Sequence, residues 1–125
     1  MNVVFTGSRN WDQIKPVTVV LSSLQDAYGG DLWVYVGDAR GLDAVVREEC
    51  SRLGIGFSVF VAQWGEFGKM AGPMRNRAML DAAAPVAVLH AFPMGGSRGT
   101  WGCVREAKER GVPVVVHAFG GSPTG

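Results

Sequence analysis

The 125-residue sequence is poor in the side chains that bind metals, with only two cysteines and two histidines. Cys50 and Cys103 belong to no CxxC pair and to no cysteine–histidine cluster, which argues against a structural zinc site and against a disulfide framework. We therefore expect two reduced, packed thiols, no bound metal and no resident cofactor.

An excess of charge of one sign is also missing. Twelve basic residues stand against eleven acidic ones, so the formal net charge is +1. A protein that binds nucleic acid nonspecifically carries a strong positive balance, so nucleic acid is not the partner we expect. A local basic patch remains compatible with this composition.

Long hydrophobic runs are absent as well. None approaches the ~20 apolar residues that cross a bilayer, and Met1–Phe5 lacks a basic segment followed by a long apolar one. We expect a cytoplasmic protein without a membrane partner. Its 47% hydrophobic content suffices for one domain, predicted over residues 1–119. The Gly/Ser/Pro-rich residues 120–125 are predicted to form a flexible tail.

Five short apolar runs alternate with segments of helical periodicity. The runs predict strands at 3–6, 32–36, 57–61, 86–89 and 112–116. Helices are predicted from an Asp12 cap to residue 28, over 42–53, from about Arg75 to 83, and from the glycine-rich turn near 99 to about 110. Residues 62–69 are predicted to be irregular. This order predicts an α/β, Rossmann-like, three-layer fold with a parallel five-stranded sheet of order 3-2-1-4-5.

A glycine-rich turn separates the fourth strand from the last helix, with the sequence Gly95-Gly96-Ser97-Arg98-Gly99-Thr100. Bare backbone N–H groups at a helix N-terminus bind anions, and the neighbouring hydroxyls and cation suit a phosphate. The alternative is an ordinary tight turn. Ligands of open α/β sheets bind at the carboxyl ends of the strands where the strand order reverses, which favours the phosphate interpretation.

Two further turns follow strands at the same predicted edge, and a third polar cluster begins the third helix. The predicted ligand-binding residues are therefore Gly7, Ser8, Arg9, Gly37, Arg40, Asp43, Arg75, Asn76, Gly95, Gly96, Ser97, Arg98, Gly99 and Thr100. Arginine forks suit phosphate, and an asparagine amide suits a base edge or a ribose.

For several of these residues a purely structural role is the alternative to ligand binding. Arg40 and Asp43 could pair with each other or cap the second helix, and Arg75–Asn76 could be a solvated helix start. Arg77 is expected to face solvent or an oligomer contact.

The aromatic residues divide by position. Trp64 and Phe67 could stack on a nucleobase, anchor the loop or form a subunit contact. Trp11 and Trp33 are assigned to packing, and Trp101 is expected in the core.

Candidate groups for proton transfer are few. His90 lies near the presumed rim but is expected to be structural rather than catalytic. Cys103 is expected to be packed, although a helix N-terminus can lower the pKa of a thiol. Glu66 is a carboxylate in the middle loop that could reach the site.

Four motifs in register resemble the SLOG superfamily, and within it the small DUF2493 (YspA-like) branch. They are Thr6-Gly7-Ser8-Arg9 with Trp11; Gly37-x-Ala39-Arg40-Gly41-x-Asp43; Trp64 and Gly68 with Ala71-Gly72-Pro73-x-Arg75-Asn76 and Met79; and Ser97-Arg98-Gly99-Thr100 with Ala107 and Gly111-Val112-Pro113-Val114. The resemblance implies a Rossmann-like fold that binds nucleotides or nucleotide derivatives. Relatives include cytokinin-activating phosphoribohydrolases, DprA-type DNA-processing proteins and sensor domains.

Enzymatic relatives carry a loop similar to PGGxGTxxE, whose glutamate serves catalysis. Gly102 or Cys103 stands at that place here, and Glu106 is expected to point away from the helix start. Asp38 replaces a usual glycine of the branch, where it could repel a phosphate or hold a ribose hydroxyl. No catalytic residue is therefore assigned.

These features favour a module that binds a nucleotide or nucleotide-derived small molecule as a sensor or sequestering protein. A nucleotide phosphoribohydrolase and a DprA-like nucleic-acid-binding protein are the alternatives. The aromatic middle loop and the positive mean hydropathy of +0.13 predict a homodimer or higher homo-oligomer.

Overall fold

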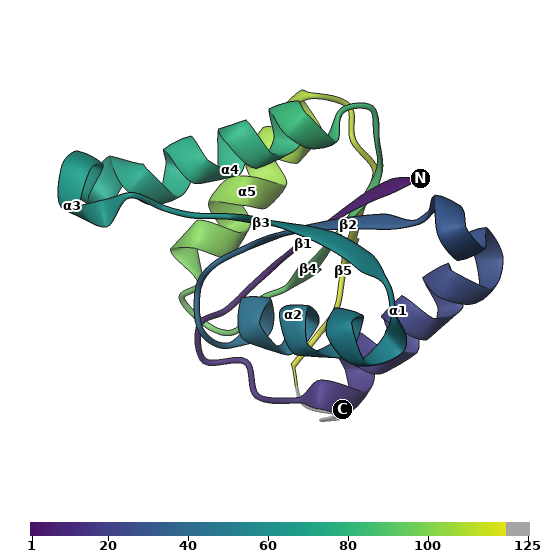
Figure 1. Cartoon of the computed structure of the whole chain (residues 1–125). Helices are drawn as coiled ribbons and strands as arrows, with labels where there is room; N and C mark the ends of the chain where they lie inside the picture. The colour runs from purple at the N-terminus through teal and green to yellow at the C-terminus, as the bar shows by residue number, and fades with distance from the viewer. Residues whose placement is uncertain (120–125) are drawn as a thin grey trace.

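A computed structural model describes residues 1–119, and their centre is a five-stranded parallel sheet of order β3-β2-β1-β4-β5 (Figure 1). The strands are β1 (Asn2–Gly7), β2 (Trp33–Gly37), β3 (Gly56–Phe60), β4 (Val86–Phe92) and β5 (Val114–Val116). The predicted fold class and strand order are confirmed. The predicted tail, residues 120–125, lies outside the described part.

Helices cover both faces of the sheet (Figure 1). They are α1 (Ile14–Tyr28), α2 (Leu42–Leu53), α3 (Trp64–Phe67), α4 (Ala71–Ala83) and α5 (Arg98–Glu109), with 3-10 turns η1 (Gly29–Asp31) and η2 (Gly68–Met70). The pair α1 and α2 lies on one face, and the pair α4 and α5 lies on the other. No described helix is long and apolar enough to span a bilayer.

Each face of the sheet has its own core, because successive side chains of a strand point to opposite faces. In β1, Val3 and Phe5 pack under α1 and α2, whereas Val4 packs with Met79 and Leu80 of α4. All five side chains are at most 1% exposed. This double burial explains why the strands read as continuous apolar runs rather than as alternating ones.

The loops after β1, β2 and β4 are tied together at the point where the strand order reverses. The Ser8 N–H donates to the Phe92 carbonyl at 3.0 Å, and the Leu42 N–H donates to the Ser8 carbonyl at 3.0 Å. Gly7 permits this approach, because a Cβ there would overlap the Leu42 side chain. The fold therefore brings three chain turns to one edge of the sheet.

Three local predictions are wrong. Asp12 does not cap α1, which begins at Ile14 after Gln13. Residues 62–69 are not irregular but contain α3 and the start of η2, which are too short to show an apolar period. Trp101 is not a core residue, since it is 42% exposed.

The two tryptophans assigned to packing differ. Trp11 is buried, with 1% exposure. Trp33 packs against Gly56 and donates from Nε1 to the Ser58 hydroxyl at 2.8 Å, yet it is 43% exposed.

Candidate functional site

A cavity of about 880 Å³ lies at the carboxyl end of the sheet, between the loops after β1, β2 and β4 and the segment from α3 to α4. All the predicted ligand-binding residues line it except Gly37 and Gly95. Gly37 packs directly against the Arg75 guanidinium and the Asp43 carboxylate, which separate it from the cavity. A Cβ at this position would overlap the guanidinium. Gly95 makes the turn, with a φ of 37°.

The floor of the cavity is polar although it is buried. Six polar or charged residues among those described are buried, and five of them line the cavity: Thr6, Ser8, Asp43, Asn76 and Thr100. The sixth, Glu49, pairs with Arg52 elsewhere. Buried polar groups cost free energy unless they are hydrogen-bonded, so their concentration at one place indicates a binding surface rather than ordinary core.

Two of these floor residues have polar atoms without a partner among residues 1–119. The Thr100 side chain is 3% exposed and forms no hydrogen bond there. Asn76 is 8% exposed, and its Oδ1 accepts from Arg75 Nε at 2.9 Å, which leaves the amide nitrogen unpaired within that range. Both side chains can therefore donate to a bound molecule.

The N-terminus of α5 forms one end of the cavity. Ser97 closes the preceding turn, where its Oγ accepts from the Met94 N–H at 3.2 Å. The backbone N–H groups of Gly99 and Thr100, in the first turn of α5, have no acceptor among the described residues. This end of the cavity thus offers backbone N–H donors at a helix N-terminus, where anions commonly bind in proteins.

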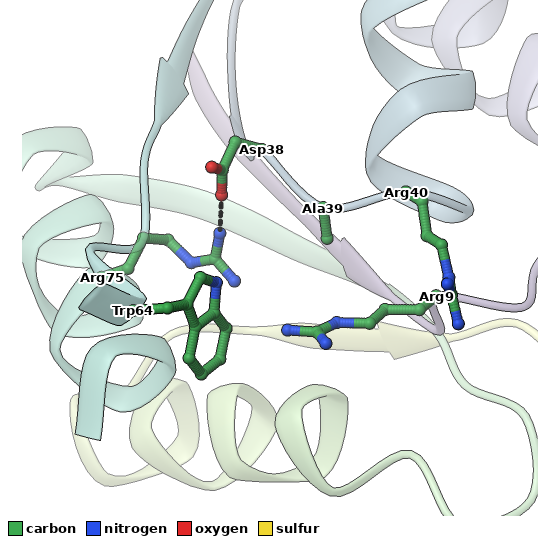
Figure 2. A pocket seen from close by; sticks show the side chains of 6 residues that line it. All are labelled: Arg9, Asp38, Ala39, Arg40, Trp64 and Arg75. Atoms are coloured by element: carbon green, nitrogen blue, oxygen red, sulfur yellow. Dashed lines mark hydrogen bonds and ion pairs between the residues drawn. The ribbon is translucent and has the colours of Figure 1, made fainter. Parts of the chain in front are cut away.

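Arg75 organises the opposite wall, which is shown in Figure 2. Its Nη1 lies 3.0 Å from Asp38 Oδ1 and 3.3 Å from the Phe60 carbonyl. Asp38 Oδ1 also accepts the Ala62 N–H at 3.2 Å. Asp38 therefore orients Arg75 and holds the chain beyond β3 in place.

Asp43 neither pairs with Arg40 nor lies at the surface. Its Oδ2 accepts the Ala39 N–H at 3.2 Å, while Arg47 donates to the Gly37 and Ala39 carbonyls at 3.0 and 3.1 Å. Burial raises the pKa of Asp43 to about 6, although Arg75 opposes this shift. Asp43 thus shapes the loop after β2.

Basic side chains gather around the cavity. Seven of the twelve lysines and arginines line it: Arg9, Arg40, Lys69, Arg75, Arg77, Arg98 and Arg105. The lining also includes Asp43, Glu106 and Glu109, so positive charge prevails. The cleft is therefore strongly basic, although the formal net charge of the whole chain is only +1.

Several lining residues were not predicted. Arg77 is exposed as expected but also lines the cavity, with its Nε 3.8 Å from Glu106 Oε1. Glu106 does not point away; it lines the cavity and accepts from Arg110 Nε at 3.0 Å. Arg105 also lines the cavity, from α5. The signal that could have predicted its position is its helical spacing from Arg98 and Gly102, which line the cavity too.

The two aromatic residues of the middle loop differ in their position relative to the cavity. Trp64 lines the cavity, and the Arg9 guanidinium lies 4.9 Å from its ring centroid. Phe67 is 40% exposed and lies outside the lining, as does Glu66. A stacking surface is therefore confined to Trp64.

The histidines and cysteines belong to the scaffold. His90 Nδ1 lies 2.9 Å from His117 Nε2, both rings stack with phenylalanines, and neither histidine lines the cavity. Burial and the neighbouring His117 lower the pKa of His90 to about 4. Cys50 and Cys103 are buried free thiols, and burial raises the pKa of Cys103 to about 11. Within residues 1–119 no group of three potential metal ligands occurs.

The strand order defines a Rossmann-like α/β protein, and its polar cleft lies at the switch point of the sheet. The sequence is 40% identical over 137 aligned positions to the Gene 61 protein of Mycobacterium phage D29, covering 97% of this chain and 98% of that protein. The chain belongs to the family of that phage protein. No family model matches the sequence.

A solved structure shares the fold. DNA processing protein A (DprA) from Streptococcus pneumoniae superposes with a TM-score of 0.55 at 17% identity, over 91% of this chain. The chain spans 58% of the DprA chain. The DprA part of the predicted resemblance is thereby supported at the level of fold.

Proposed function

We propose that the protein binds a nucleotide or a nucleotide-derived small molecule in the cleft at the carboxyl end of the sheet. The observation that carries the proposal is the buried polar floor, where five of six buried polar residues gather. A phosphate is the group that fits best at the α5 end, where N–H groups without an acceptor in residues 1–119 lie beside the Thr100 hydroxyl and Arg98.

The remaining surface suits the rest of a nucleotide. Asn76 offers an amide to a base edge or ribose, and Trp64 offers an aromatic face. A cavity of about 880 Å³ lies within the range of small-molecule sites. A phosphoribohydrolase is less well supported, because Glu106 is engaged with Arg77 and Arg110.

Thr100→Val separates a binding role from a structural one. Valine has nearly the same shape, and removing a buried hydroxyl without a partner in the described chain should raise the free energy of unfolding by about 1 kcal/mol. The same change should weaken binding about 10-fold, since a hydrogen bond to the anion is lost. Calorimetric titration with AMP, ADP-ribose, NAD and cyclic AMP, together with urea unfolding, measures both effects.

Thr18→Val is the matched control. The Thr18 hydroxyl lies in α1, donates to Glu49 Oε1 at 2.6 Å and does not line the cavity. This variant should lose stability and keep ligand affinity. If no nucleotide binds to the folded wild-type protein, the proposal is wrong.

A second candidate function is binding to single-stranded nucleic acid. The basic lining and the exposed Trp64 ring favour it, and the similar solved structure is a DNA processing protein. Binding of a labelled oligodeoxynucleotide should then weaken steeply between 50 and about 200 mM salt. Absence of a gel shift at low salt would eliminate this candidate and leave the small-molecule proposal intact.

A further inference from the structure

A smaller pocket of about 270 Å³ adjoins the main cavity. It is lined by Arg9, Asp38, Ala39, Arg40, Trp64 and Arg75, which are drawn in Figure 2. Five of these residues also line the main cavity, whereas Ser97, just before α5, and Gly99 and Thr100 in α5 line only the main one. The smaller pocket is therefore part of the same cleft, on a side that α5 does not line.

Positive charge in the smaller pocket is only partly balanced. It contains three guanidinium groups and one carboxylate, and that carboxylate is used by Arg75 and by the Ala62 N–H. No acidic side chain among residues 1–119 forms an ion pair with Arg9 or Arg40. An anion bound in this pocket would be attracted by guanidinium groups that have no carboxylate partner in the described chain.

The scaffold packs the two loops that carry these arginines against each other. Gly41, with a φ of 73°, lets the loop after β2 pack on the backbone of Ser8 and Arg9, because a Cβ there would overlap both. Figure 2 shows the Arg9 side chain extending across the pocket toward Trp64, whose ring centroid lies 4.9 Å from the guanidinium carbon. This contact limits the freedom of Arg9 and presents its donors to the pocket.

We infer that the ligand carries two separate anionic groups, one bound at the α5 N-terminus and the other between Arg9 and Arg40. This inference rests on the proposed function for the first group and adds the second. Two features built from different loops each supply donors for an anion, and the cleft joins them. The chemical class is therefore a nucleotide with phosphates at two positions rather than a simple monophosphate.

The test compares AMP, ADP and adenosine 3′,5′-bisphosphate by calorimetry at constant ionic strength. The 3′,5′-bisphosphate should bind at least ~10-fold more tightly than AMP, because it gains charge-assisted hydrogen bonds at the second position. ADP, whose phosphates are adjacent, should gain less. Equal gains for ADP and the 3′,5′-bisphosphate would overturn the claim that the two anions are separate.

The double variant Arg9→Gln/Arg40→Gln tests the assigned residues. It should abolish the preference for the 3′,5′-bisphosphate, so that AMP and the 3′,5′-bisphosphate bind the variant with affinities within about threefold of each other. Lys15→Gln/Lys108→Gln removes the same charge at exposed positions outside the cleft and should keep the preference.

The two proposals fail differently. If none of the three nucleotides binds, the proposed function itself is wrong. If AMP binds and the bisphosphate binds no more tightly, or if the lysine variant loses the preference as fully as the arginine variant, only the two-anion inference is overturned.

Discussion

Replacing Arg75 with methionine is expected to lower the free energy of unfolding by about 3 kcal/mol and to weaken nucleotide binding about 100-fold. The Arg75 side chain is 11% exposed and donates to Asp38, to the Phe60 carbonyl and to Asn76 Oδ1. Methionine fills a similar volume but leaves these acceptors without their donor. Because Arg75 also lowers the pKa of Asp43, that pKa should rise further in the variant.

Two further variants separate the role of the Arg75 hydrogen bonds from the effect of losing a positive charge in the cleft. Arg75→Lys keeps the charge but not the planar fork, so it should fall between wild type and methionine in both measurements. Arg105→Met removes an exposed cleft arginine that has no ion pair within residues 1–119, and its stability should stay within about 0.5 kcal/mol of wild type. Urea unfolding and calorimetry would contradict the account if Arg75→Met unfolded like Arg105→Met.

The second large effect is a pair of opposing pH dependences. The pKa of His90 is lowered from 6.5 to about 4, so the unfolded chain binds the proton more tightly, and stability should fall as the pH drops through this range. The pKa of Asp43 is raised from 3.8 to about 6, so the folded protein binds that proton more tightly, and stability should fall as the pH rises. Each contribution amounts to about 3 kcal/mol at most.

Between pH 4 and 6 these contributions offset each other, and variants should expose them separately. Asp43→Asn should lose stability as the pH falls from 6 to 4. His90→Gln/His117→Gln should show the opposite slope, since burial also lowers the pKa of His117. Urea unfolding at pH 4, 5 and 6 measures both slopes, and equal slopes in the two variants would refute the assignment.

The fold was predictable from the sequence because its signals are redundant. Apolar runs such as Val86–Leu89 lie between helical segments, and parallel strands with both faces covered have few possible orders. Short elements carry no such signal: α3 has four residues and is followed at once by Gly68, which has a φ of 56°. The start of α1 was misplaced because Asp12 has the chemistry of a cap but not its position.

The position of the candidate site in the fold was predictable from the sequence, but most of the side-chain contacts within it were not. The switch-point rule brought the turns at Gly7 and Gly96 together, and the structure places them around one cavity. Pairings across elements could not be predicted: Asp38 lies 37 residues from Arg75 in sequence. For the same reason the sequence did not predict that Glu106 lines the cavity, since its partner Arg77 lies on another helix.

The most direct test of the central claim follows individual amide groups while AMP is added to ¹⁵N-labelled protein. The account predicts the largest chemical-shift changes at the backbone N–H groups of Gly99 and Thr100 and at the Asn76 side-chain amide, with little change at Gly54, which ends α2 outside the cavity lining. Saturating changes confined to residues outside the cleft, with Gly99 and Thr100 unmoved, would contradict it.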